Sequence, residues 1–139
     1  MITSMQQKNK ALKDIETYEK RLKSKAKAGV PEVVVALSQS QLRDSIADLK
    51  ADIDDYEAAC SADIRQLQFS DFLQLCRLPI IIRLSTKMTI PQFAQLTDIS
   101  ESQLKRYEAT EYEAAPPVVL SRILAAFNLT LNSTVRQSA

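Results

Sequence analysis

The sequence feature that most constrains the fold is a heptad pattern of apolar residues in the first half of the chain. Between Leu42 and Cys60 the apolar positions step by four, three, four, three and four residues. This spacing keeps a narrow apolar stripe on one side of a helix, which is stable only when the stripe packs against another helix. An earlier set at helical spacing predicts a first helix: Met5, Leu12, Ile15, Tyr18, Leu22 and Ala26.

Turn-forming residues separate these two predicted helices. Gly29 and Pro31 end the first helix, and Ser38 with Gln41 fits a capping box that opens the second, which leaves residues 30–37 as a connector that is either irregular or helical in part. The helices pair either as a hairpin within one chain or as part of the helical bundle of a dimer. We expect residues 1–68 to serve in oligomerisation or partner binding. The residues expected to mediate oligomerisation are Leu42, Ile46, Leu49, Ile53 and Tyr56.

Charge is distributed unevenly, although the 139 residues carry a formal net charge of only +1. Residues 1–30 hold eight basic and three acidic residues, whereas residues 31–70 hold three basic and eight acidic residues. Residues 71–139 are nearly neutral, with seven basic and six acidic residues. Opposite charge on successive segments favours two helices that lie side by side and neutralise each other.

The composition excludes several classes of function. Histidine is absent, which removes histidine bases, histidine-activated nucleophiles and histidine metal ligands. Gly29 is the only glycine, so the chain has no glycine-rich phosphate loop. We therefore expect no enzymatic activity, no metal and no cofactor. No apolar run reaches about 18 residues, so we expect no membrane partner and a cytoplasmic protein in which Cys60 and Cys76 are free thiols.

The second half of the chain carries helix-start signals at short intervals. A Leu-Pro pair at residues 78–79 suits the first turn of a short helix. Thr89 with Gln92 forms a capping box, and the same device recurs eleven residues later as Ser100 with Gln103. Two capped helices so close together predict a tight helix-turn-helix over about residues 89–108.

A last helix is predicted after a pair of prolines at residues 116–117. Asn128 occupies the left-handed position that often ends a helix, and Leu129 is expected to pack back on it. Residues 69–131 are therefore expected to form a second, helical domain. Residues 132–139 show no periodicity and are expected to form a flexible tail.

Several residues of this second domain resemble the lambda-repressor-like, XRE-type DNA-binding family. They are Arg83, Thr89, Phe93-Ala94, Ile99-Ser100 and the run Leu104-Lys105-Arg106-Tyr107-Glu108. The run from Arg106 to Tyr112 is similar to antitoxins of the HigA kind that carry an N-terminal helical extension. The resemblance implies an all-α protein in which a long helical hairpin or coiled coil precedes a five-helix DNA-binding domain. Its third helix would enter the major groove. Asp98 stands where the family usually has glycine in the turn, and aspartate tolerates a left-handed conformation.

The resemblance also implies roles for individual residues. Arg83 and Glu108 would form a buried or half-buried ion pair that ties the first helix of the domain to the end of its third. Arg106 would read guanine in a bidentate manner, and Lys105 would meet a phosphate. The residues expected at the DNA are Gln92, Glu101, Ser102, Gln103, Lys105, Arg106, Thr110 and Tyr112. Thr110 and Tyr112 lie in the loop after the third helix, and they either bond phosphates or belong to a purely structural loop.

Three functions are compatible with these features. The first is a sequence-specific transcriptional regulator that binds double-stranded DNA as a homodimer and associates with the nucleoid. The second is an antitoxin that represses its own operon and binds a toxin protein, for which the acidic segment between Glu32 and Arg65 would suit a basic partner. The third is a coiled-coil adaptor whose helix-turn-helix has lost DNA binding, because Ile90, Pro91 and Glu101 occupy positions that normally face DNA.

Overall fold

A computed structural model describes all residues from 1 to 139, and it confirms the all-α class. The chain forms seven helices and no strand. They fall into two compact units, residues 1–59 and residues 60–139. The division lies nine residues before the boundary predicted at 68, because residues 60–68 belong with the second unit. None of the helices combines the length and the apolar character that crossing a bilayer requires.

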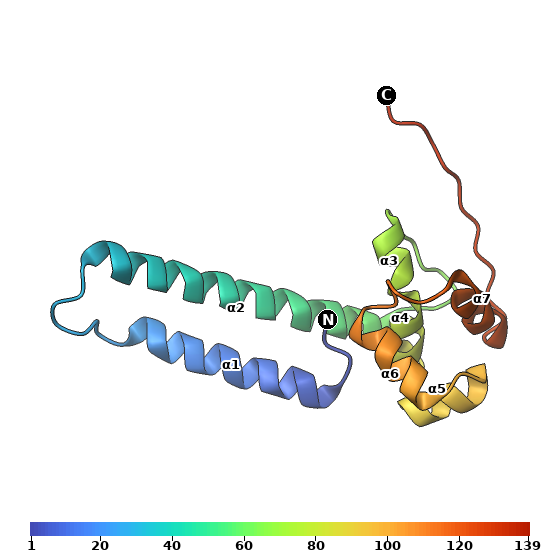
Figure 1. Cartoon of the computed structure of the whole chain (residues 1–139), viewed down its shortest axis with the longest axis horizontal. Helices are drawn as coiled ribbons and strands as arrows, with labels where there is room; N and C mark the ends of the chain where they lie inside the picture. The colour runs from blue at the N-terminus through green and yellow to red at the C-terminus, as the bar shows by residue number, and fades with distance from the viewer. The chain divides into compact units, whose positions relative to one another are not determined.

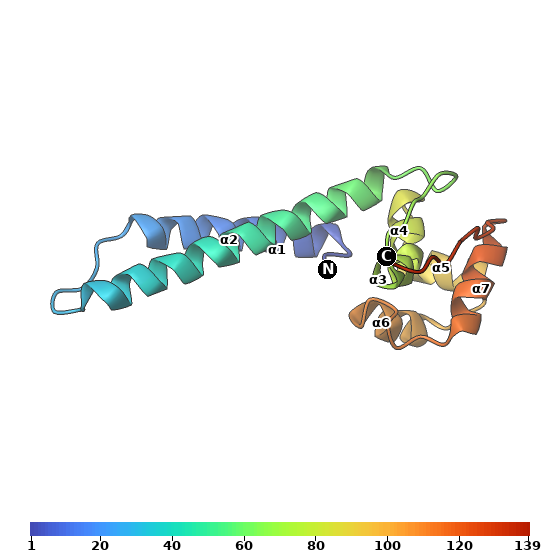
Figure 2. The same ribbon diagram turned by 90° about the horizontal axis from the view of Figure 1, so that it is seen from above.

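The first unit is a hairpin of two antiparallel helices, α1 (Met5–Lys23) and α2 (Glu32–Ser61), joined by residues 24–31 (Figures 1 and 2). Charged side chains link the two helices. The Lys8 ammonium pairs with the Glu57 carboxylate, and Lys50 Nζ lies 3.8 Å from Glu19 Oε1. Of the two arrangements left open by the sequence, the hairpin within one chain is therefore the one adopted.

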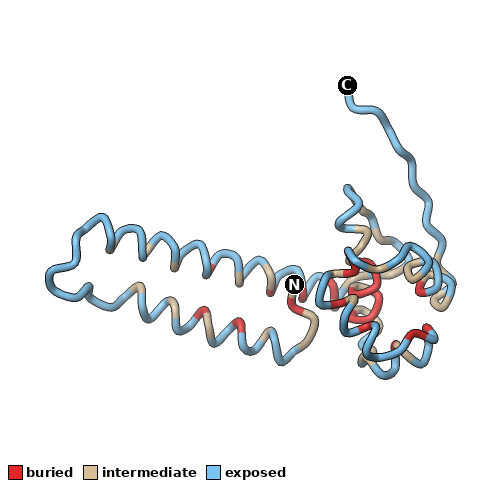
Figure 3. Tube along the Cα trace, in the orientation of Figure 1, coloured by how far each residue is buried: buried red, intermediate tan, exposed pale blue.

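The apolar stripes are used inside this hairpin. Ala11 and Ile15 of α1 are buried, as are Ile46 and Ile53 of α2 (Figure 3). Tyr56 is also buried, and the remaining members of the expected oligomerisation set are half-buried: Leu42 and Leu49. The expectation that this set mediates oligomerisation is therefore wrong for the buried residues, because they already pack within a single chain.

The start of α2 differs from the one predicted. Helix α2 begins at Glu32, six residues before the Ser38 capping box, so residues 32–37 are helical and Ser38 lies inside the helix. The Pro31 carbonyl oxygen accepts from the N–H groups of Val34 and Val35 at 3.0 and 3.2 Å, which starts the helix. Proline suits a helix start because its fixed φ is close to the helical value.

One capping device recurs at four helix starts. The cap side chain accepts a hydrogen bond from the backbone N–H of a glutamine three residues later, which satisfies a donor that the helix leaves free. It occurs in α1, in α3 (Phe72–Cys76), in α5 (Ile90–Thr97) and in α6 (Glu101–Ala109). At α5 the Gln92 side chain also accepts from the Thr89 N–H, which completes the capping box; at α6 only the serine half forms. The four pairs are Ser4–Gln7, Asp71–Gln74, Thr89–Gln92 and Ser100–Gln103.

The second unit packs four helices around a fifth, α4 (Leu78–Ser85), which is the most deeply buried of them (Figure 3). Helix α5 packs against α6 and against α7 (Pro117–Ala126). Asn128, with φ 54°, ends α7, and the Leu129 N–H donates to the Leu124 carbonyl at 2.9 Å, as the sequence predicts. No helix follows α7. The fully buried apolar side chains include Ile80, Ile82, Phe93, Leu104 and Ile123.

Candidate nucleic-acid interface

The helix-turn-helix predicted from the capping signals is formed by α5 and α6. Asp98 connects the two helices with φ 56° and ψ 37°, the left-handed conformation expected at this turn. Arg122 of α7 donates a hydrogen bond to the Asp98 carbonyl at 3.4 Å. Inside the turn Ile99 is buried, and the Thr97 hydroxyl donates to the Phe93 carbonyl at 2.7 Å. The Arg122 bond thus ties the turn to α7, and the buried Ile99 anchors it in the core.

Helix α6 has one buried and one exposed side. Leu104 and Glu108 are buried, and their four-residue spacing places them on one face. Ser102, Lys105 and Arg106 are exposed on the opposite side, where the two cations follow Ser102 by three and four residues, and no part of the second unit covers them. This exposed side, which we call the α6 face, offers one hydroxyl and two cations in a row about one helical turn long.

The cations of the α6 face are free of ion pairs, unlike several arginines of the same unit. Arg77 Nη2 lies 3.0 Å from Glu111 Oε2, and Arg65 pairs with Asp63 at 2.8 Å. No carboxylate lies within pairing distance of Lys105 or Arg106. Both side chains therefore keep their donors available for an anionic or hydrogen-bond-accepting ligand.

Arg83 and Glu108 hold α6 in place from beneath. Arg83 Nε lies 2.6 Å from Glu108 Oε1, and Nη2 lies 3.0 Å from Oε2, so α4 is joined to α6 through two parallel bonds. The Arg83 guanidinium also donates to the Met88 carbonyl at 3.1 Å, which fixes the loop before α5. The side chains are only 8% and 6% exposed. The pair implied by the family resemblance is thus present, and it does not reach the surface.

The remaining polar residues expected at the site have mixed positions. Gln92, Glu101, Gln103 and Thr110 are all exposed. The Gln92 side-chain oxygen, however, accepts from the Thr89 N–H at 2.9 Å, which leaves its amide group to face outward. Thr110 Oγ1 donates to the Tyr107 carbonyl at 3.2 Å. Of these four residues, only Gln92 and Thr110 carry side-chain bonds within the chain, both at a helix end.

Tyr112 is the exception, and the expectation that it contacts phosphate is wrong. The residue is 4% exposed, and its ring centroid lies 5.7 Å from that of Tyr107. Glu111 and Tyr112 have successive positive φ values of 53° and 61°, which turn the ring into the core. No protein group bonds the hydroxyl. Burial raises the pKa of Tyr112 above its ordinary value, and the nearby Glu108 carboxylate adds to the rise.

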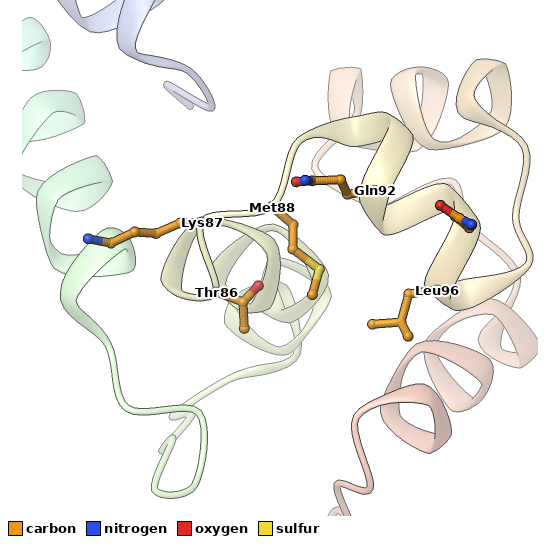
Figure 4. A pocket seen from close by; sticks show the side chains of 6 residues that line it. Thr86, Lys87, Met88, Gln92 and Leu96 are labelled. Carbon is orange, nitrogen blue, oxygen red and sulfur yellow. The ribbon is translucent and has the colours of Figure 1, made fainter.

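A depression of about 590 Å³ lies beside the start of α5, where α4 and α5 are joined (Figure 4). Met88, Leu96 and the amide side chains of two glutamines, Gln92 and Gln95, line the depression. The side chain of Lys87, at φ 57°, extends away from them. No pattern in the sequence predicts this depression.

No family model, no curated protein and no solved structure matches the chain. What its residues do must therefore be inferred from their geometry.

Proposed function

We propose that the second unit binds double-stranded DNA through α6 and that the protein is a sequence-specific transcriptional regulator acting as a homodimer. The observation that carries the proposal is the α6 face, on which Lys105 and Arg106 project without ion pairs beside the exposed Ser102 from a rigidly held helix. An α-helix fits the major groove of B-form DNA, where side chains of this kind reach base edges and phosphates. The sequence resemblance to XRE-type regulators favours the same role.

The chemistry of the two cations assigns them different tasks. The Arg106 guanidinium has the fork of donors that matches O6 and N7 of guanine, and such a contact discriminates between bases by about 1–3 kcal/mol. Lys105 carries a point charge that suits a phosphate, which adds affinity without sequence preference. One short helix reads only a few base pairs, so a dimer that reads two half-sites about 34–36 Å apart is required for useful specificity.

The experiment is a selection of bound duplexes from a random pool, followed by fluorescence anisotropy titrations on the selected site. Arg106→Ala is expected to lower affinity for the selected site by about 1–3 kcal/mol and to relax preference at one position. Lys105→Ala is expected to weaken binding to all duplexes and to lower the salt slope by about 1.

Arg136→Ala, which removes an exposed charge from the non-helical C-terminal segment, serves as the matched control and is expected to retain both affinity and preference. Circular dichroism verifies that each variant keeps its helices. Absence of binding to any duplex at low salt would overturn the proposal. Unchanged site preference in Arg106→Ala would place the reading surface outside α6.

A further inference from the structure

The hairpin unit is neutral as a whole but strongly polarised along its length. Residues 1–59 hold ten basic and ten acidic residues. Residues 20–37, which we call the basic tip, hold five basic residues and one acidic residue. Residues 38–59 hold two basic and six acidic residues, and those six lie between 44 and 57 in the remainder of α2, which we call the acidic stretch. Positive charge therefore gathers where the hairpin turns and negative charge toward the other end of α2 (Figure 1).

Pairing inside the hairpin leaves most of this charge unused. The interhelical ion pairs engage Lys8 with Glu57 and Lys50 with Glu19, so only Glu57 of the acidic stretch is neutralised by α1. No carboxylate lies within pairing distance of three lysines at the end of α1 and in the connecting loop: Lys23, Lys25 and Lys27. Five carboxylates of the acidic stretch have no cation within pairing distance: Asp44, Asp48, Asp52, Asp54 and Asp55.

The basic tip also exposes a group of apolar side chains. Val33 and Leu37 of α2 are 79% and 59% exposed. They lie on the side of α2 that faces away from the buried Ile46 and Ile53. Exposed aliphatic groups next to one another on a helix gain free energy when a partner covers them. Farther along the same exposed side lie two small residues, Ala47 and Ala51, which leave room for larger side chains of a neighbouring helix.

We propose that the hairpins of two chains associate antiparallel through the exposed sides of their α2 helices. A twofold axis at the level of residue 42 places Val33 opposite Ala51 of the second copy and Leu37 opposite its Ala47, because both pairs share that midpoint. The same register brings the lysines of the basic tip beside the end of the acidic stretch of the other chain. The contact between a basic tip and an acidic stretch therefore occurs twice in the dimer.

This inference specifies the dimer that the proposed function requires, and it is tested without DNA. The measurement is sedimentation velocity of the full chain over a range of micromolar concentrations. Lys25→Glu/Lys27→Glu and Asp54→Lys/Asp55→Lys are each expected to raise the dimer dissociation constant at least tenfold. A mixture of the two variants is expected to form a heterodimer, because each reversed cluster then faces a reversed complement.

Lys13→Glu/Arg136→Glu is the matched control, since it changes net charge as much as the tip variant but lies outside both clusters. It is expected to dimerise like the unmodified chain. A chain that stays monomeric, or charge variants that dimerise normally, overturns the inference whether or not DNA binds. Cosedimentation with vesicles of anionic phospholipid in place of self-association also overturns it, and assigns the basic tip to a lipid surface.

Discussion

Arg83 and Glu108, 25 residues apart in the sequence, form a buried bidentate ion pair that joins α4 to α6, with atom-to-atom distances of 2.6 and 3.0 Å. A guanidinium and a carboxylate withdrawn from water are stable together only when nearly all of their hydrogen-bonding groups find partners. The third bond of Arg83, to the Met88 carbonyl, helps to meet that condition. The pair therefore fixes the position of α6 from below, while the α6 face stays open above.

Removing one member of this pair is expected to destabilise the second unit severely. Arg83→Ala leaves the Glu108 carboxylate buried and uncompensated, at a cost of about 3–5 kcal/mol in the free energy of unfolding. Urea unfolding followed by circular dichroism measures the loss. Arg83→Met/Glu108→Leu, which replaces both charges by apolar groups of similar size, is expected to recover most of the stability. Unfolding of Arg83→Ala at the same urea concentration as the unmodified chain would contradict a structural role for the pair.

Tyr112→Phe is expected to leave stability unchanged or to raise it by about 1 kcal/mol, because it removes a buried hydroxyl that no protein group bonds. It is also expected to change the response to alkali. Since the pKa of the folded-state phenol is raised, the unfolded chain loses this proton first, near pH 10. The stability gained by keeping this phenol protonated in the folded state is complete below that pH and is lost as the pH rises above it. Thermal unfolding at pH 8 and at pH 10.5 tests this.

Tyr18→Phe is the control for this titration, because Tyr18 lies partly exposed in α1. The melting temperature of this variant is expected to fall as the pH rises, by as much as that of the unmodified chain. A Tyr112→Phe variant with the same fall would show that the buried phenol does not contribute to the alkaline loss.

The turn at Asp98 is expected to reverse the usual order of alanine and glycine. At φ 56°, Asp98→Ala places a Cβ in the left-handed region, whereas Asp98→Gly has no such penalty, so the glycine variant is expected to be more stable by about 1 kcal/mol. At Lys105, in the middle of α6, alanine is expected to be more stable than glycine by about 1 kcal/mol. Urea unfolding of the four variants makes the comparison. Alanine ahead of glycine at both positions would show that the turn is not strained.

Local signals in the sequence predicted the helix starts of the second unit because capping involves residues only three positions apart. Thr89 with Gln92 and Ser100 with Gln103 mark the starts of α5 and α6 where they were expected. The start of α3 carries the same signal, Asp71 followed by Gln74, and it was missed because the helix that follows is only five residues long. The opposite error occurred at Ser38, where a matching pattern lies inside α2, since Pro31 had already started that helix.

By itself, the sequence determined the helical class, the capped starts of α5 and α6, and the left-handed turn at Asp98, because each depends on neighbours along the chain. Only the tertiary structure decided that Ile46 and Ile53 pack within one chain and that Tyr112 turns inward. A heptad stripe covers itself equally well with a helix of its own chain or of another, so spacing does not identify the partner. The direction of a side chain after a helix depends on backbone angles and on distant packing, which the order of residues does not display.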